Sequence, residues 1–322
     1  MPDALRKFDI DIVTRTGPGS LAGAYMRRFW HPVRRAQDLA PGTAVPMRIM
    51  GENFTLYRGA SGPHAVAERC AHRRTVLAAG FVEGDCIRCL YHGWKYDAQG
   101  QCIEQPAELG EAFAEKVRIR AYPTYEYLDL IFVYLGPGEP PPRLRFPEFE
   151  APGGCLNAST YLRECNYFQN IENGVDEAHL PFTHRRSIFE QLNREAPRIE
   201  AEERPYGLVQ LAYRSDGTAR EQHLMLPNML SMSLPSADPA ERDWRIYVSW
   251  RVPIDDERHM TFVIERLALA DDAAPAYRAR RAAEAERLAA LPSAQEVTRA
   301  ILDGRMRLHD AADRPDFLTI QD

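Results

Sequence analysis

The stretch CAHRRTVLAAGFVEGDCIRCLYHGWKYD, residues 70–97, limits what this chain can fold into more than any other part of it. It contains two pairs of metal-ligand residue types, Cys70-x-His72 and Cys89-x2-His92, separated by sixteen residues. Two such pairs, each in its own loop, can hold a two-iron cluster in which two thiolates bind one iron and two imidazoles bind the other, as in a Rieske centre. Neutral imidazoles in place of thiolates raise the reduction potential of such a cluster above that of all-thiolate ferredoxins.

A structural zinc site is the alternative interpretation of the same stretch. Its ligands would be Cys70, Cys86, Cys89 and Cys102. Because residues at odd offsets in a strand point to opposite faces, Cys86 and Cys89 would need a tight turn to bind one ion together. A zinc site would also leave His72 and His92 without a role. The paired spacing therefore favours the iron cluster, in which Trp94 is expected to shield the metal from water.

A second group of candidate ligands lies about a hundred residues further on, in NYFQNIENGVDEAHLPFTH. Asp176 and His179 are three residues apart and would share one face of a helix. His179 and His184 would diverge by about 140° on an unbroken helix. Pro181 lies between them and is expected to end the helix, so that His184 can turn back toward His179. Two imidazoles and a carboxylate form the facial triad of non-haem Fe(II) oxygenases, although a mononuclear zinc hydrolase could use the same residue types.

Composition excludes several classes of function. The formal net charge is −6 and the pI is near 5.9, which argues against nucleic acid or an anionic membrane as a partner. No apolar run approaches the length of a membrane span, and the N-terminus lacks the apolar core of a secretory signal. With six cysteines and no such signal, the sequence predicts a cytoplasmic protein whose thiols are free or metal-bound.

The chain is long enough for two domains, and the pattern of its residue types changes along its length. Short β-branched and aromatic runs fill residues 46–135, and a proline-rich segment, GPGEPPPRLRFPEFE, follows at residues 136–150. Prolines do not fit the interior of a sheet, so a domain boundary is expected there. The predicted domains are an N-terminal helical segment packing on the catalytic domain (1–40), a β domain (41–145) and a catalytic domain (146–322).

The expected elements make the chain α+β. Residues 19–35 predict a short helix that Pro32 breaks. Runs between residues 207 and 269 predict the strands of a second, antiparallel sheet. Two helices are expected after it, the second beginning at Ser293 in a capping box with the glutamate three residues on.

On the motifs CAHRRT and CLYHGWKYDAQGQC, the chain resembles the terminal oxygenase components of Rieske non-haem iron ring-hydroxylating oxygenases, in the branch of phthalate dioxygenase and aromatic O-demethylases. The resemblance extends from RTGPGS to LTIQD. It implies a small all-β Rieske domain inserted before an α+β catalytic domain with a central antiparallel sheet of helix-grip type. It also implies a Rieske [2Fe-2S] cluster on Cys70, His72, Cys89 and His92, whereas Cys86 and Cys102 would be packing residues.

The resemblance also assigns roles in the second group. His179 and His184 resemble the ligands of a mononuclear Fe(II). Asp176 resembles the residue that carries electrons from a neighbouring subunit's Rieske histidine, and Asn166 resembles a residue near the iron that does not bind it. The third ligand would be Asp322, with Asp316 in reserve; the other late carboxylates considered are Asp303, Asp310 and Asp313. Relatives of this type continue beyond that position, so the catalytic domain is expected to be truncated.

These expectations combine into a function. The chain would be an enzyme that activates O2 to hydroxylate or O-demethylate an aromatic compound, such as an aromatic acid or aryl ether. With no dinucleotide-binding fingerprint in the sequence, electrons would come from a separate NAD(P)H-dependent reductase, with or without a ferredoxin. The resemblance implies a homotrimer. The alternative from another class is a non-catalytic Rieske-type electron carrier or zinc-binding protein, which would leave the second histidine group unexplained.

Overall fold

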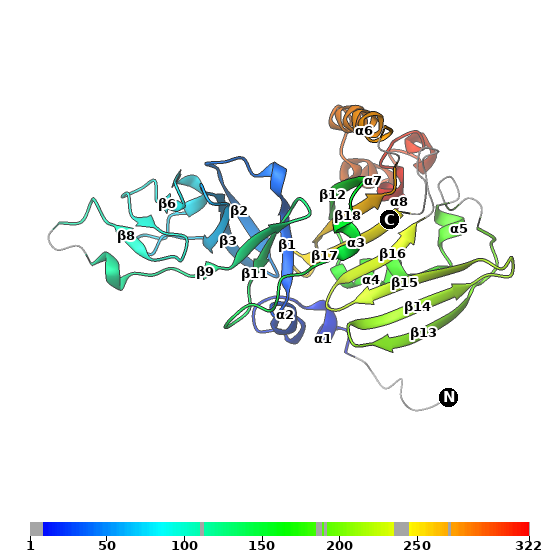
Figure 1. Cartoon of the computed structure of the whole chain (residues 1–322), viewed down its shortest axis with the longest axis horizontal. Helices are drawn as coiled ribbons and strands as arrows, with labels where there is room; N and C mark the ends of the chain where they lie inside the picture. The colour runs from blue at the N-terminus through cyan, green and yellow to red at the C-terminus, as the bar shows by residue number, and fades with distance from the viewer. Residues whose placement is uncertain are drawn as a thin grey trace. The chain divides into compact units, whose positions relative to one another are not determined.

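Figure 1 presents the fold, a computed structural model that describes residues 9–109, 113–184, 189, 192–234, 245–269 and 272–321. Contacts between backbone positions divide the chain into two compact units. The first unit is Met1–Arg145 with Val252–His259, and the second is Phe146–Arg251 with Met260–Asp322. The division after Arg145 falls inside the proline-rich segment. The packing of residues 1–40 on the catalytic domain stays a prediction.

The first unit is built from short strands. Its elements are α1 (Asp11–Thr14), α2 (Leu21–Met26), β1 (Trp30–Arg35), β2 (Ala44–Ile49), β3 (Glu52–Arg58), β4 (Pro63–Ala67), β5 (Phe81–Glu83), β6 (Cys86–Arg88), β7 (Lys95–Tyr96), β8 (Cys102–Glu104), β9 (Ala121–Tyr122), β10 (Thr124–Tyr127) and β11 (Leu130–Tyr134), with 3₁₀ turns η2 (Ala36–Asp38), η3 (Leu77–Ala79) and η4 (Ala114–Lys116). They form three small sheets, in the orders β1-β11-β10, β2-β3-β4-β9 and β5-β6-β7-β8.

The burial of these strands follows from their sequence and position. β11 reads LIFVY and is buried at all five residues, as expected of the central strand of its sheet. The predicted helix over residues 19–35 is wrong in its second half, because β1 begins at Trp30. Pro32 does not break a helix but lies in the edge strand β1, opposite Phe132 and next to a register shift. An edge strand tolerates proline because one side of its backbone needs no partner strand.

The second unit contains the larger sheet. Its elements are α3 (Pro147–Glu150), β12 (Cys155–Arg163), α4 (Tyr167–Val175), α5 (Leu180–Thr183), β13 (Arg198–Arg204), β14 (Gly207–Tyr213), β15 (Ala219–Met225), β16 (Met229–Leu234), β17 (Arg245–Pro253), β18 (His259–Leu267), α6 (Ala274–Ala289), α7 (Ala294–Leu302), η5 (Leu308–Ala311) and α8 (Phe317–Gln321). The seven strands are ordered β12-β18-β17-β16-β15-β14-β13, and every neighbouring pair from β13 to β17 is antiparallel.

The sheet has a buried centre and one solvated edge. Trp250 on β17, with Phe262 and Ile264 on β18, is at most 2% exposed, whereas all seven residues of β13 are exposed. β13 reads RIEAEER, and such charges keep an edge strand from pairing with another chain. The antiparallel sheet expected between residues 207 and 269 is confirmed, and β12 and β13 extend it.

Helices complete the second unit. α4 contacts β16, and α6 packs on β12 and β18 through a cluster that includes Tyr277 and Leu267 (Figure 1). The predicted capping box is present: Ser293 Oγ accepts from Glu296 N, and the Glu296 carboxylate accepts from Ser293 N. No helix in the described part of the chain is long and apolar enough to cross a membrane.

Candidate functional site

Cys70 and Cys89 begin two loops with the same backbone hydrogen bonds. In each loop the cysteine N–H donates to the carbonyl five residues on, at 2.9 and 2.8 Å, and the N–H four residues on donates back at 3.1 Å. The donor of that returning bond has positive φ, 62° at Arg74 and 74° at Gly93. This left-handed conformation folds a short loop back on itself, and glycine adopts it at no steric cost. The two Cys-His pairs therefore lie on equivalent loops of the first unit.

The cysteines and the histidines of the two loops differ in burial. Cys70 and Cys89 are 1% and 3% exposed and belong to the core of the β module. His72 and His92 are only partly buried, with ring centroids 4.6 Å apart. His72 Nδ1 is buried without a hydrogen-bond partner, which is costly for a nitrogen that is not a metal ligand. Two buried thiols beside two neighbouring imidazoles match the donor set of a Rieske cluster.

Three further residues surround these ligands. The Trp94 ring stacks on His72 at 4.8 Å and 6°, and its Nε1 donates to Glu108 Oε1 over 2.9 Å. The same carboxylate oxygen lies 3.9 Å from His72 Nε2. Tyr96 OH accepts from the backbone N–H of residue 71 and lies 3.2 Å from Cys70 Sγ. Trp94 is 3% exposed and covers one face of His72, and its role in shielding the metal from water stays a prediction.

The geometry argues against the zinc alternative. In the described part of the chain, which includes all four cysteines, no three His, Cys, Asp or Glu side chains converge on one ion position. A structural zinc site needs four. A two-iron cluster takes only two protein ligands per iron, which is compatible with this arrangement. Cys86 lies on β6, and Cys102 is buried on β8, with Sγ 3.6 Å from Glu104 O.

The second histidine group lies where two short helices meet. α4 ends at Val175 with Asp176 as its C-cap, and a new helix, α5, follows with His179 as its N-cap. The expectation that Pro181 ends a helix is therefore wrong. Pro181 lies in the first turn of α5, where proline's missing N–H costs nothing and its fixed φ favours the helix. The expected outcome is nevertheless reached, because α5 places the His179 and His184 rings 5.2 Å apart.

Asp176 lies next to the first of these histidines. Its Oδ1 accepts from Ala178 N over 2.8 Å, which fixes the carboxylate in a turn. Its Oδ2 lies 3.4 Å from His179 Nδ1, a nitrogen that is buried without a hydrogen bond. The Asp176 side chain is 49% exposed, whereas that of His179 is 18% exposed. One oxygen of Asp176 thus faces an imidazole while the residue remains open to solvent.

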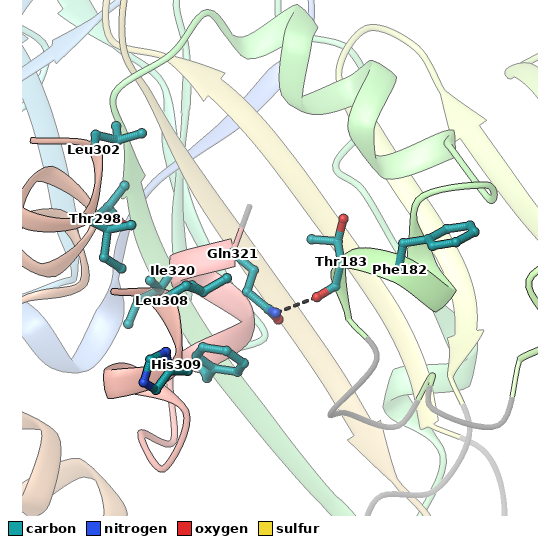
Figure 2. A pocket seen from close by; sticks show the side chains of 10 residues that line it. Phe182, Thr183, Thr298, Leu302, Leu308, His309, Ile320 and Gln321 are labelled. Carbon is teal, nitrogen blue, oxygen red and sulfur yellow. Dashed lines mark hydrogen bonds between the residues drawn. The ribbon is translucent and has the colours of Figure 1, made fainter. Parts of the chain in front are cut away.

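His184 is held by the last described residue of the chain. Gln321 Nε2 donates to Thr183 O (Figure 2), so Gln321 Oε1 is the atom that faces His184 Nδ1, at 3.1 Å. A carbonyl oxygen only accepts, and Nδ1 must therefore carry the proton of the imidazole. The lone pair then lies on Nε2, the tautomer that a metal ligand needs. Sequence reasoning did not identify Gln321, and no local signal in the sequence pointed to it.

The late carboxylates are placed less favourably for a third ligand. Asp316 pairs with Arg314 through both oxygens, each at 2.8 Å. Asp303 and Asp310 pair with arginines in their own turns. Among the described residues, no carboxylate converges with His179 and His184 as a three-residue metal group. Asp322 lies outside the described residues, and its role as third ligand stays a prediction.

The two histidines border a cavity of about 170 Å³ inside the second unit. Its lining comes from α4, α5, α8 and strands β12 and β15 to β18. Gly174 lets α4 approach the sheet, because a Cβ there would lie 2.3 Å from Leu230 Cδ1. Asn166 is the N-cap of α4, where it accepts from Phe168 N over 2.9 Å, and it is not among the described lining residues.

A buried carboxylate lies behind this cavity. Glu177, whose side chain is fully buried, has Oε2 3.3 Å from Arg214 Nη2, and its Oε1 accepts from Gln222 Nε2. Arg220 Nη1 lies 3.5 Å from the same Oε1. Neighbouring Asp176 faces outward while Glu177 faces inward, so the two acidic residues of the motif have different surroundings. Sequence reasoning overlooked Glu177, Arg214 and Arg220.

A larger hollow of about 690 Å³ lies beside α5, α7 and α8 (Figure 2). Its lining is mainly apolar, from Phe182, Ile301, Leu302 and Phe317 among others, and His309 is its one titratable side chain in the described part of the chain. Neither His179 nor His184 lines it. The larger cavity is therefore not the candidate active site. The smaller cavity, which His179 and His184 border, is the better candidate.

The chain is similar to known proteins both in its β module and over most of its length. Residues 29–123 match the model of the Rieske [2Fe-2S] domain. Over 283 residues the chain is 31% identical to phenoxybenzoate dioxygenase subunit alpha of Ectopseudomonas oleovorans, covering 80% of this chain and 68% of that one. The chain belongs to the oxygenase components of the Rieske non-haem iron oxygenases. The resemblance in its motifs is thereby confirmed.

Other members of the family are similar over a comparable span. The oxygenase subunit of 5,5'-dehydrodivanillate O-demethylase from Sphingobium sp. (strain NBRC 103272 / SYK-6) is 32% identical over 78% of this chain and 60% of its own. The chain thus spans about 60% of the length of such relatives. The terminal oxygenase of carbazole 1,9a-dioxygenase from Novosphingobium sp. KA1 is 22% identical, with a TM-score of 0.65 over 84% of this chain and 79% of that one. That likeness confirms the expected fold class of a Rieske β domain and a sheet-rich α+β domain.

We expect Tyr96 to tune the reduction potential of the Rieske cluster. Burial raises the pKa of Tyr96 well above its usual range, so the phenol keeps its proton and can donate to Cys70 Sγ. Hydrogen bonds to the sulfurs raise the reduction potential. We expect Tyr96→Phe to lower the potential by on the order of 59 mV, one tenfold change in a one-electron equilibrium, in a redox titration followed by EPR. Tyr57→Phe is the matched control, because Tyr57 lies in the same core but donates to Asp85 O. Equal potentials in wild type and Tyr96→Phe would refute the role.

Proposed function

We propose that this protein is the terminal oxygenase component of a multi-component system that hydroxylates or O-demethylates an aromatic compound with O2. The observation that carries the proposal is the presence of two separate donor sets. One is Cys70, His72, Cys89 and His92 on equivalent loops, and the other is His179 and His184 at a cavity. A Rieske cluster supplies single electrons, and a non-haem Fe(II) supplies open coordination positions for dioxygen.

Each group of residues would have a separate role in this function. The paired loops hold Cys70 and Cys89 in the core and place the partly buried His72 and His92 side by side, and Trp94 would limit the access of water. Gln321 accepts from His184 Nδ1, which would leave Nε2 as the nitrogen available to bind a metal. Asp176, partly exposed and next to His179, is the proposed bridge to a Rieske histidine of a neighbouring subunit in a head-to-tail homotrimer. Asp322 is the proposed third ligand of the iron.

The relatives support the reaction class and leave the substrate open. Their names include a phenoxybenzoate dioxygenase, a 3-chlorobenzoate-3,4-dioxygenase and a dehydrodivanillate O-demethylase. One solved structure of similar fold is an oxygenase–ferredoxin complex of carbazole 1,9a-dioxygenase. A separate NAD(P)H-dependent reductase, with a ferredoxin where the reductase lacks its own iron–sulfur centre, is the proposed electron source.

Metal analysis tests the proposal directly. The purified protein, expressed with iron and sulfide supply, is expected to contain acid-labile sulfide and iron in excess of that sulfide, because the cluster holds equal numbers of both and the second site adds iron. Reduction with dithionite is expected to produce a Rieske-type EPR signal. Zinc without labile sulfide or a Rieske signal would reject the proposal. Substrate-dependent O2 uptake with a competent reductase would then separate an oxygenase from an electron carrier.

A further inference from the structure

We propose that Glu177 is a positioning residue for the proposed iron site, because its buried carboxylate fixes the turn that carries Asp176 and His179. The inference rests on the proposed function for the roles of those two residues, and on the contacts of Glu177 for the anchoring itself. Glu177 lies in the connection between α4 and α5, one residue after Asp176 and two before His179. Its side chain is fully buried, and it lines neither of the two cavities beside α5.

The Glu177 carboxylate is held from β14 and β15. Gln222 Nε2 on β15 donates to its Oε1. Arg214, which directly follows β14, donates from Nη2 to Oε2 over 3.3 Å, and Arg220 Nη1 on β15 forms an ion pair with Oε1 at 3.5 Å. The three partners are 2%, 7% and 8% exposed, so these contacts form away from water. Charge-assisted hydrogen bonds are about twice as strong as neutral ones, which makes this a firm anchor.

The backbone on both sides of Asp176 is fixed as well. Arg214 Nη2 also donates to Glu177 O, over 2.8 Å. Gln210 Nε2 on β14 donates to Val175 O over 2.7 Å, at the last residue of α4. The carbonyl there has no partner within the helix, and Gln210 supplies one. The connection is therefore tied to the sheet immediately before and immediately after Asp176.

This anchoring sets the direction of Asp176. The backbone of Asp176 is extended, with φ −79° and ψ 109°. Successive side chains of an extended backbone point to opposite sides. Because Glu177 is held inward, Asp176 is turned outward, and its side chain is 49% exposed. The carboxylate turned outward in this way is the one whose Oδ2 lies 3.4 Å from His179 Nδ1.

The charges around Glu177 are better suited to fixing a turn than to stabilising the fold. A buried ion pair loses its hydration on folding, and the attraction between its charges often does no more than offset that loss. Two arginines share the single carboxylate here, so the network holds more buried positive than negative charge. In contrast to an apolar side chain, however, a carboxylate bonded through both oxygens has one defined orientation.

Glu177→Gln tests the inference with a nearly isosteric change. An amide has one acceptor oxygen, so its NH2 group must face Gln222 Nε2 or Arg214 Nη2, which are both donors. We expect this conflict to displace the turn and to lower the affinity for Fe(II) at the second site by at least about tenfold, measured in equilibrium with a chelator of known affinity. The EPR spectrum of the Fe(II) complex with nitric oxide is expected to change, while the Rieske-type EPR signal stays as in wild type.

Glu265→Gln is the matched control. Glu265 on β18 pairs with Arg245 at 3.6 Å and accepts from Asn157 Nδ2, so the variant removes the same charge from the same sheet without touching the turn. It is expected to bind Fe(II) and nitric oxide as wild type does. Loss of Fe(II) affinity in Glu177→Gln alone supports a positioning role. If Glu177→Gln lowers only the unfolding temperature and keeps the wild-type affinity and spectrum, the inference is overturned.

Arg214→Lys provides a second, independent change to the same anchor. Lysine keeps the positive charge but lacks the planar guanidinium whose Nη2 reaches Glu177 O and Oε2 together. A lower affinity for Fe(II) is expected again. If Glu177→Gln does not fold, Arg214→Lys decides by the same measurements and the same criteria.

The outcome is separable from that of the proposed function. Hydrogen exchange of the Ala178 amide, which donates to Asp176 Oδ1, is measured on the protein as purified. If wild type binds no Fe(II) at the second site, the proposed function is wrong. Exchange of this amide at least about tenfold faster in Glu177→Gln would then still support the anchor, and unchanged exchange would overturn it. If wild type and Glu177→Gln bind Fe(II) equally well, the inference is overturned and the oxygenase stands.

Discussion

His179→Ala is expected to abolish substrate oxidation while leaving the Rieske-type EPR signal of the protein unchanged. The reason is the separation of the two donor sets: Cys70 and its partner ligands lie in the first unit, and His179 lies in the second. Removing one of two neighbouring imidazoles leaves His184 as the single histidine at the cavity. We therefore expect the iron content to fall toward the two irons of the cluster, with labile sulfide unchanged.

The comparison needs a histidine variant in the same unit that does not touch the cavity. His223 on β15 pairs with Glu221 and contacts Tyr206 OH, so His223→Ala controls for a general loss of folding. Iron and sulfide analysis, EPR and O2 uptake on both variants separate the effects. Normal turnover in His179→Ala would show that His179 is not a ligand of the catalytic metal.

Asp176→Asn is expected to lower turnover by about 10- to 100-fold or more while both metal centres stay loaded. The substitution is nearly isosteric, and the asparagine carbonyl can still accept from Ala178 N as Asp176 Oδ1 does. What it removes is the negative charge 3.4 Å from His179 Nδ1. A role in passing electrons to that histidine therefore predicts loss of activity without loss of metal or of folded structure.

Rapid mixing of the reduced protein with O2 and substrate measures this effect, because oxidation of the cluster can be followed optically. Glu172→Gln removes the same charge from an exposed position on the same helix and is expected to behave as wild type. Slow cluster oxidation in Asp176→Asn alone would support the bridge. Equal slowing in both variants would reduce Asp176 to a general electrostatic contribution.

Much of the fold could be predicted because its signals are local. The strands from β14 to β18 and the capping box at Ser293 depend on side chains within a few residues of one another. The structural roles of Pro32 and Pro181 could not be predicted from the sequence. Proline is compatible with an edge strand and with the first turn of a helix as well as with a helix end. Only tertiary context selects among these.

The candidate site could likewise be predicted only in part. Both histidine groups carry their spacing in the sequence. Gln321, in contrast, meets His184 across 137 residues, and Arg220 on β15 lies 3.5 Å from Glu177, between α4 and α5. A buried arginine beside a buried carboxylate looks in sequence like any arginine on a strand, here in AREQHLM.

The contact between Gln321 and His184 has a thermodynamic consequence. By linkage, if docking of α8 sets the tautomer that favours a metal on His184, then the metal must favour docking of α8 by the same free energy. α8 and the metal centre would then be coupled. Loss of iron would weaken the docking of α8, and a change that frees α8 would lower the affinity for iron. Protection of the α8 amides from hydrogen exchange would accordingly report on metal occupancy.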